Sequence, residues 1–135
     1  MFSTSKILVP VCAALIGVFT AAPASAEAYE GQIQVWFSPN GGVKQAVIDA
    51  ARQAQKRIRV SIYKIESPEI TKALIEAARR GVSVEVVLDA KKMHLKASQK
   101  KVLAEAGIPV YADAMHKTFH DKFMVVDGLR VATGS

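Results

Sequence analysis

Cysteine is almost absent from this chain of 135 residues, in which Cys12 is the only one. A single cysteine can form neither an internal disulfide nor a thiolate zinc site, so a disulfide-rich scaffold and a cysteine-based zinc finger are excluded. Long apolar runs are absent too. The apolar run at residues 7–20 has 14 residues, fewer than the roughly 20 that a membrane-spanning helix needs.

The N-terminal segment has the pattern of a secretory signal. Lys6 precedes the apolar run, and Ala24-Ser25-Ala26 fits the small-x-small rule for cleavage. We therefore predict a signal peptide over residues 1–26 and one catalytic domain over residues 27–135, in the periplasm or secreted. Cys12 would leave with the signal. An uncleaved membrane anchor is the alternative, but the short run favours cleavage, with no stable membrane insertion afterwards.

Basic residues outnumber acidic ones in the predicted mature chain. The whole chain has 18 Lys and Arg against 12 Asp and Glu, and losing Lys6 leaves 17 against 12, a net charge of +5. Such a charge favours an anionic partner such as DNA or RNA, or an anionic membrane. The densest cluster lies at residues 91–101. Within it Lys96 and Lys100 could track substrate phosphates, or could form an ordinary solvated helix face.

Alternating helix and strand patterns predict an α/β fold. Apolar spacing of i, i+3 and i+4 indicates helices over residues 43–55, 68–80 and 96–106, the second capped by Ser67 and ended by Gly81. Strands are expected at residues 33–37, 58–63, 82–88, 110–112, 119–126 and 129–133. This order predicts an α-β-α sandwich with a mixed, largely parallel sheet.

The segment from His120 to Asp127 has the pattern H-x-K-x4-D, followed six residues later by Gly134-Ser135. Residues two apart on a strand point to the same face, so His120 and Lys122 should lie side by side. A histidine can attack phosphorus, and a lysine can hold the non-bridging oxygens of a phosphate. The pair therefore suits phosphodiester chemistry.

Asp127-Gly128 between two apolar runs predicts a hairpin with a two-residue type I′ turn. That turn would pair the following residues: Val126 with Leu129, Met124 with Val131, Lys122 with Thr133, and His120 with Ser135. Thr133 and Ser135 would then share a patch with the His-Lys pair. Asp127 would lie about 23 Å from His120 along the strand, at roughly 3.3 Å per residue. It is therefore predicted to be structural.

The motif resembles that of the phospholipase D superfamily, H-x-K-x4-D-x6-G-S-x-N, and residues 33–110 look like its small bacterial nuclease branch. The match comprises His120, Lys122, Asp127, Gly134 and Ser135. The closing Asn would fall beyond the last residue, so we expect a C-terminally truncated chain that is less stable and less active than an extended one.

The resemblance implies a metal-independent mechanism with no cofactor. His120 would form a phosphohistidine, Lys122 would replace a metal cation, and Ser135 would complete the catalytic residues. A second imidazole must protonate the leaving oxygen. Because the chain has one H-x-K motif, the resemblance implies a homodimer with one shared active site.

The predicted function is a non-specific endonuclease acting on DNA or RNA. A phospholipase D acting on membrane lipid and a non-catalytic nucleic-acid-binding remnant remain alternatives. Other candidates carry less signal. His116 and His120 lack a third ligand at the spacing of a zinc site. Asp89 is predicted to be a loop or helix-cap residue. Tyr63 is predicted to be an aromatic residue of the core or its rim.

Overall fold

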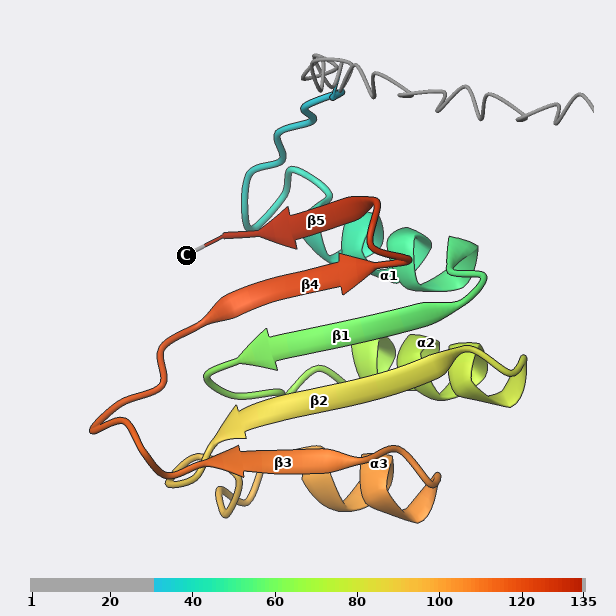
Figure 1. Cartoon of the computed structure of the whole chain (residues 1–135). Coiled ribbons are helices and arrows are strands. Elements are labelled where there is room, and N and C mark those ends of the chain that lie inside the picture. Colours follow the sequence, from blue (N-terminus) through green and yellow to red (C-terminus); the bar gives the residue numbers. More distant parts are fainter. Residues whose placement is uncertain (1–30, 135) are drawn as a thin grey trace, which may run out of the picture. The chain divides into compact units, whose positions relative to one another are not determined.

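The structure, a computed structural model, describes residues 31–134 (Figure 1). The predicted signal peptide and Ser135 lie outside the described residues. The described elements are α1 (Val43–Gln53), β1 (Arg57–Ile62), α2 (Pro68–Arg79), β2 (Ser83–Asp89), α3 (Lys100–Glu105), β3 (Val110–Asp113), β4 (Lys122–Val126) and β5 (Arg130–Thr133).

The five strands form one mixed sheet in the order β3-β2-β1-β4-β5. The pairs β1–β2 and β2–β3 are parallel, whereas β4 runs antiparallel to both β1 and β5. The prediction of an α/β fold with a mixed, largely parallel sheet is confirmed. Among residues 31–134, the three helices lie together on one face of the sheet (Figure 1).

Period-two alternation in the strands builds the core. On β1, Ile58 and Val60 are buried while the alternating Arg57 and Arg59 are exposed, and β2 buries Val84, Val86 and Leu88. Successive strand side chains point to opposite faces, so the apolar set faces the helices. Leu74 of α2 and Leu103 of α3, both fully buried, meet that set from the helical layer. The sheet is thereby a rigid platform for the residues at its edges.

Helix boundaries follow the local chemistry. Ser67 caps α2, because its hydroxyl accepts a hydrogen bond from the Ile70 N–H at 3.3 Å, and Gly81 takes a positive φ of 91° just after the helix ends. The third helix was predicted to begin at Lys96 but begins at Lys100. Residues before it turn instead, with the Gln99 N–H bonded to the Ile65 carbonyl, so Lys96 lies outside the helix.

The strand predicted at residues 33–37 does not form. Ile33 is 89% exposed and Phe37 is 74% exposed, and within residues 31–134 this segment has no partner in the sheet. A strand must exchange backbone hydrogen bonds with a neighbour, so an apolar run without one stays irregular.

The hairpin register differs from the prediction by one residue. Asp127 and Gly128 both have positive φ, and the Leu129 N–H bonds to the Val126 carbonyl at 3.1 Å, as a type I′ turn requires. Leu129, however, stands outside the ladder, and Val126 pairs with Arg130. The loop therefore has an extra residue, as in a β-bulge. The rest of β5 moves by one position, which exchanges its two faces.

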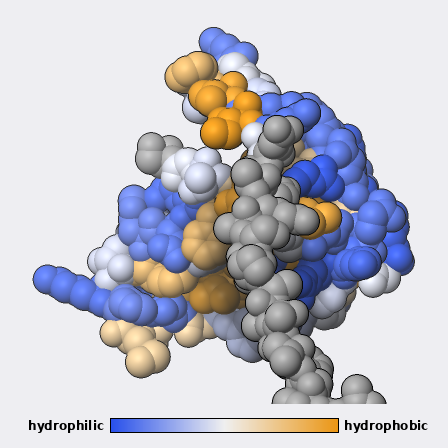
Figure 2. Space-filling view, turned by 45° about the horizontal axis from the view of Figure 1, so that its top comes forward, coloured by the Kyte–Doolittle hydropathy of each residue, from blue (hydrophilic) through white to orange (hydrophobic). Residues whose placement is uncertain are grey.

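Hydrophilic residues cover most of the surface visible in Figure 2, with hydrophobic residues in smaller patches between them. Exposed apolar side chains of the described residues include Leu129, Val131 and Met115. No helix within residues 31–134 is both long and apolar enough to cross a membrane.

Candidate active site

The candidate site lies at the edge of the sheet where the three parallel strands end. Tyr63 follows β1, while Asp89 and Asp113 are the last residues of β2 and β3. Because β4 is antiparallel to β1, its first residue, Lys122, pairs with Ile62 at this same edge. The carboxyl ends of strands in α/β sheets commonly form ligand sites. The topology thus gathers residues that are up to 59 positions apart, from Tyr63 to Lys122.

His120 and Lys122 lie side by side. The Lys122 Nζ is 3.1 Å from the His120 Nδ1 and 3.0 Å from its Nε2. Between them in sequence, Asp121 accepts a hydrogen bond from the Ser61 hydroxyl at 2.9 Å. An ammonium group only donates, and a neutral imidazole has one ring nitrogen with a lone pair that can accept from it; which of the two nitrogens this is depends on the tautomer. That lone pair is what a nucleophile requires.

The predicted strand began at residue 119, whereas β4 begins at Lys122. The start of the strand is therefore wrong by three residues, and His120 lies just ahead of the ladder. The pairing between β1 and β4 nevertheless extends by one more hydrogen bond ahead of Lys122, because the Tyr63 N–H donates to the Asp121 carbonyl at 2.8 Å. His120 is therefore anchored by neighbours on both sides while its ring remains exposed.

Tyr63 packs against the His-Lys pair. Its ring meets the His120 ring edge-on, with centroids 4.7 Å apart. The Lys122 Nζ is 5.8 Å from the Tyr63 centroid, and the Lys92 Nζ is 5.1 Å from it. Both ammonium groups lie over the ring, within the roughly 6 Å at which its electron-rich face attracts a cation. Tyr63, predicted to be a core or rim aromatic, is half-buried and links the imidazole to two cations.

Asp89 joins two loops at the site. One carboxylate oxygen accepts from the N–H groups of Lys91 (2.9 Å) and Lys92 (3.2 Å), and the other accepts from the Phe119 N–H at 2.9 Å. The Phe119 N–H, the largest contribution, lowers the pKa of this carboxyl. Asp89 is only 2% exposed and thus fixes the residue next to His120. Sequence reasoning assigned it a loop or cap role and missed this long-range contact.

Asp127 lies at the other end of β4 from His120. Its Oδ1 accepts from the N–H groups of Lys56 (2.8 Å) and Arg57 (2.9 Å), and its Oδ2 accepts from the Gln55 N–H at 2.9 Å. These bonds, led by that of Arg57, lower the pKa of the carboxyl to about 2. Asp127 therefore ties the hairpin turn to the start of β1.

Thr133, Lys96 and Lys100 are further predicted site residues. Thr133 pairs with Phe123 and not, as predicted, with Lys122, because the extra loop residue moves β5 by one position. The Thr133 hydroxyl instead donates to the Lys122 carbonyl at 3.2 Å, and the Gly134 N–H donates to it at 3.3 Å. Lys96 and Lys100 make no hydrogen bond or ion pair with His120 or Lys122 within residues 31–134.

His116 lies in the loop before β4 and pairs with Asp113. Its Nδ1 is 2.9 Å from the Asp113 Oδ2, and its backbone N–H, the largest contribution, lowers the pKa of that carboxyl. In the described part of the chain, no three His, Cys, Asp or Glu side chains gather as they would around a metal ion.

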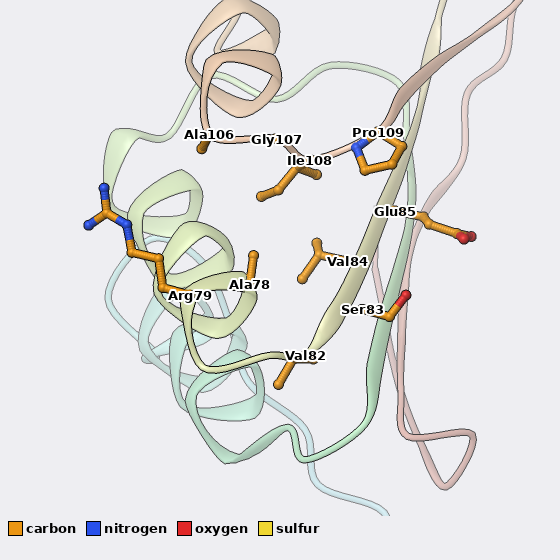
Figure 3. Close-up of a pocket in the computed structure, with 10 residues that line it drawn as sticks. All are labelled: Ala78, Arg79, Val82, Ser83, Val84, Glu85, Ala106, Gly107, Ile108 and Pro109. Atoms are coloured by element: carbon orange, nitrogen blue, oxygen red, sulfur yellow. The ribbon is translucent and has the colours of Figure 1, made fainter.

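A shallow cavity of about 340 Å³ lies at the opposite end of β2. Figure 3 shows Val84 and Ile108 directed into it, and the Arg79 side chain extending away from it. Ser83 begins β2, whereas Asp89 ends it. This cavity therefore contains none of the residues around His120.

Comparisons with known proteins agree with the motif. The family model described as "Cardiolipin synthase, PLD-like domain" matches residues 47–135. Phospholipase D of Rickettsia typhi is 31% identical over 103 residues, which cover 76% of this chain and 50% of that protein. Mitochondrial cardiolipin hydrolase of Xenopus laevis is 38% identical over 82 residues, covering 61% of this chain and 39% of that protein.

A solved structure agrees as well. The crystal structure of Nuc, a phospholipase D family member from Salmonella typhimurium, has a TM-score of 0.72 and 38% identity, covering 76% of this chain and 68% of that one. The chain spans about half the length of the curated relatives it matches. The stretch that the family model matches, residues 47–135, contains His120 and Lys122. The chain belongs to the phospholipase D superfamily.

Proposed function

We propose that this protein is a phosphodiesterase that hydrolyses nucleic acid as a non-specific endonuclease. The observation that carries the proposal is the His120–Lys122 pair, in which an exposed imidazole lies 3.0 Å from an ammonium group at the end of a rigid strand. The pair supplies a nucleophile and a cation for phosphate oxygens at one place. Membership of the phospholipase D superfamily supports the same chemistry.

In the proposed first step, a non-bridging phosphate oxygen draws the Lys122 ammonium away from the imidazole and frees its lone pair. His120 then attacks phosphorus, forming a P–N bond as the bond to the leaving oxygen breaks. A second, protonated imidazole gives its proton to that oxygen. The same imidazole next takes a proton from water, whose oxygen attacks phosphorus and releases His120.

The second imidazole comes, in this proposal, from a second copy of the chain. The sequence contains three histidines, and His116 is held by Asp113 while His94 lies in the loop after β2. Two copies of the His-Lys pair facing each other across a two-fold axis supply the identical groups that the two steps need. The proposed active form is therefore a homodimer.

Nucleic acid is preferred over lipid because of the loops around the site. Residues 91–101 contain five lysines. Lys91 and Lys92 follow β2 with their backbone N–H groups on Asp89, and the Lys92 Nζ lies over the Tyr63 ring. Basic loops favour a polyanionic strand. The names of the relatives, phospholipase D and cardiolipin hydrolase, favour membrane phospholipid as the second candidate.

The test is plasmid nicking with and without EDTA, beside release of headgroup from phospholipid vesicles. We expect nicking that EDTA does not reduce. His120→Ala should be inactive, and His94→Ala, an exposed histidine elsewhere, should match the wild type. Headgroup release without nicking would transfer the assignment to lipid. Activity lost in EDTA and restored by a divalent metal would refute the metal-independent mechanism.

Localisation is proposed from the N-terminal pattern alone. Cleavage between Ala26 and Glu27 would deliver the protein to the periplasm or the medium. N-terminal sequencing of the protein recovered from a periplasmic extract should begin at Glu27. An intact N-terminus in the membrane fraction would contradict this.

A further inference from the structure

Lys92 is the second cation that touches the Tyr63 ring. Its Nζ lies 5.1 Å from the ring centroid, and the Lys122 Nζ lies 5.8 Å from it. The two ammonium groups are therefore at most about 11 Å apart, the sum of these distances, so both can contact neighbouring phosphates of one strand. Lys92 thus belongs to the same site as the His-Lys pair.

The position of Lys92 is fixed from two sides. Its backbone N–H is held by the buried Asp89, which also holds Phe119 next to His120. Its side chain lies over the Tyr63 ring, and Tyr63, the largest contribution, raises the pKa of the ammonium group. A lysine in a free loop loses rotamer entropy on binding, whereas Lys92 is partly ordered beforehand.

Lys92 and Lys122 differ from the lysines that are held in salt bridges. Four lysines in the described range have a carboxylate within salt-bridge distance: Lys44, Lys64, Lys72 and Lys101. Lys91 donates to the Lys117 carbonyl at 2.8 Å. Within residues 31–134, neither Lys92 nor Lys122 has a carboxylate at that distance. Two cations on one aromatic ring, neither of them in a salt bridge within that range, form a positive site that an anionic ligand would bind.

We infer that Lys92, held by Tyr63 and Asp89, binds the phosphate next to the scissile one in a nucleic acid strand. The inference rests on the proposed function, in which Lys122 holds the scissile phosphate. Lys92 would then favour a substrate with two or more consecutive phosphates over a single phosphodiester. Tyr63 acts as a positioning residue, because its ring lies against both the Lys92 ammonium group and the His120 ring.

Kinetics with two substrates separate these roles. The substrates are a single-stranded oligonucleotide and bis(p-nitrophenyl) phosphate, which has one phosphodiester. We expect Lys92→Gln to lower kcat/KM on the oligonucleotide about tenfold more than on the ester, mainly through KM. Tyr63→Phe, which keeps the ring that Lys92 lies over, should leave this preference close to that of the wild type. Lys72→Gln, an exposed lysine on α2, is the matched control.

Binding gives a second readout that does not depend on turnover. A labelled oligonucleotide is titrated with His120→Ala protein, with and without Lys92→Gln, between 50 and 200 mM salt. Losing one phosphate contact should make the slope of log K against log salt shallower by about 0.7 for a single strand. The same change at Lys72 should leave the slope unaltered.

The outcomes are distinguishable. If the wild type cleaves the oligonucleotide but Lys92→Gln behaves like Lys72→Gln in both readouts, the role of Lys92 is refuted and the proposed function stands. If the wild type cleaves the ester and not the oligonucleotide, the proposed function itself is refuted. A selective effect of Lys92→Gln on diphosphate lipid in cardiolipin vesicles, without one on the oligonucleotide, would overturn the assignment to nucleic acid.

Discussion

Replacing Asp127 by Asn should separate the stability of the hairpin from catalysis. Asn keeps one carbonyl oxygen, which can still accept from the N–H groups of Lys56 and Arg57, the two bonds made by the Asp127 Oδ1. Its amide NH₂ would instead face the Gln55 N–H, donor against donor. Asn also tolerates the φ of 56° at this position. Turnover should therefore be kept and stability reduced.

The magnitude follows from the pKa of Asp127, lowered from 3.8 to about 2. The folded protein then binds the proton at most roughly sixty-fold more weakly than the unfolded chain, an upper bound because water screens a half-exposed carboxylate. Because the folded pKa is the lower one, this contribution is present above pH 3.8 and is lost as the pH falls through about 2. The asparagine variant lacks it at every pH.

The assay is the thermal midpoint of both proteins from pH 7 to pH 2. The difference between wild type and Asp127→Asn should be largest above about pH 5 and should shrink toward pH 2. Asp49→Asn, on the exposed side of α1, is the control and should follow the wild type. A constant difference across this range would refute the role of the carboxylate. Turnover lost as deeply as in His120→Ala, with unchanged stability, would show that Asp127 acts in catalysis.

Other outcomes follow from the same contacts. His120→Ala should lower turnover by several orders of magnitude, on the order of 10⁶-fold as for a removed nucleophile, with an unchanged circular dichroism spectrum; a normal rate would exclude it as nucleophile. Specific activity should fall on dilution if the active form is a dimer, and a monomer with full activity by light scattering and assay would exclude the shared site. Asp89→Asn places an NH₂ group against backbone N–H groups, so it should lower kcat and raise proteolysis in the loop before His120; wild-type values of both would refute its clamping role.

The features that depend only on residues close together in the chain could be predicted from the sequence. Ser67 caps α2 and Gly81 follows its end, since both effects depend on residues within one turn of the helix. Asp127-Gly128 forms the left-handed turn because few residue types tolerate that backbone. The spacing of His120 and Lys122 likewise placed their side chains together. In each case the interacting groups are neighbours in sequence.

What only the tertiary structure decided is how distant segments meet. The extra loop residue Leu129 changed the partner of Thr133, because the register depends on packing against β4 as well as on the turn. Asp89 reaches Phe119 across 30 positions, and Asp127 reaches Gln55 across 72. Such hydrogen bonds leave no periodic pattern in the sequence, because their partners are set by the strand order of the sheet. That order also places Lys92 and Lys122 on the same Tyr63 ring.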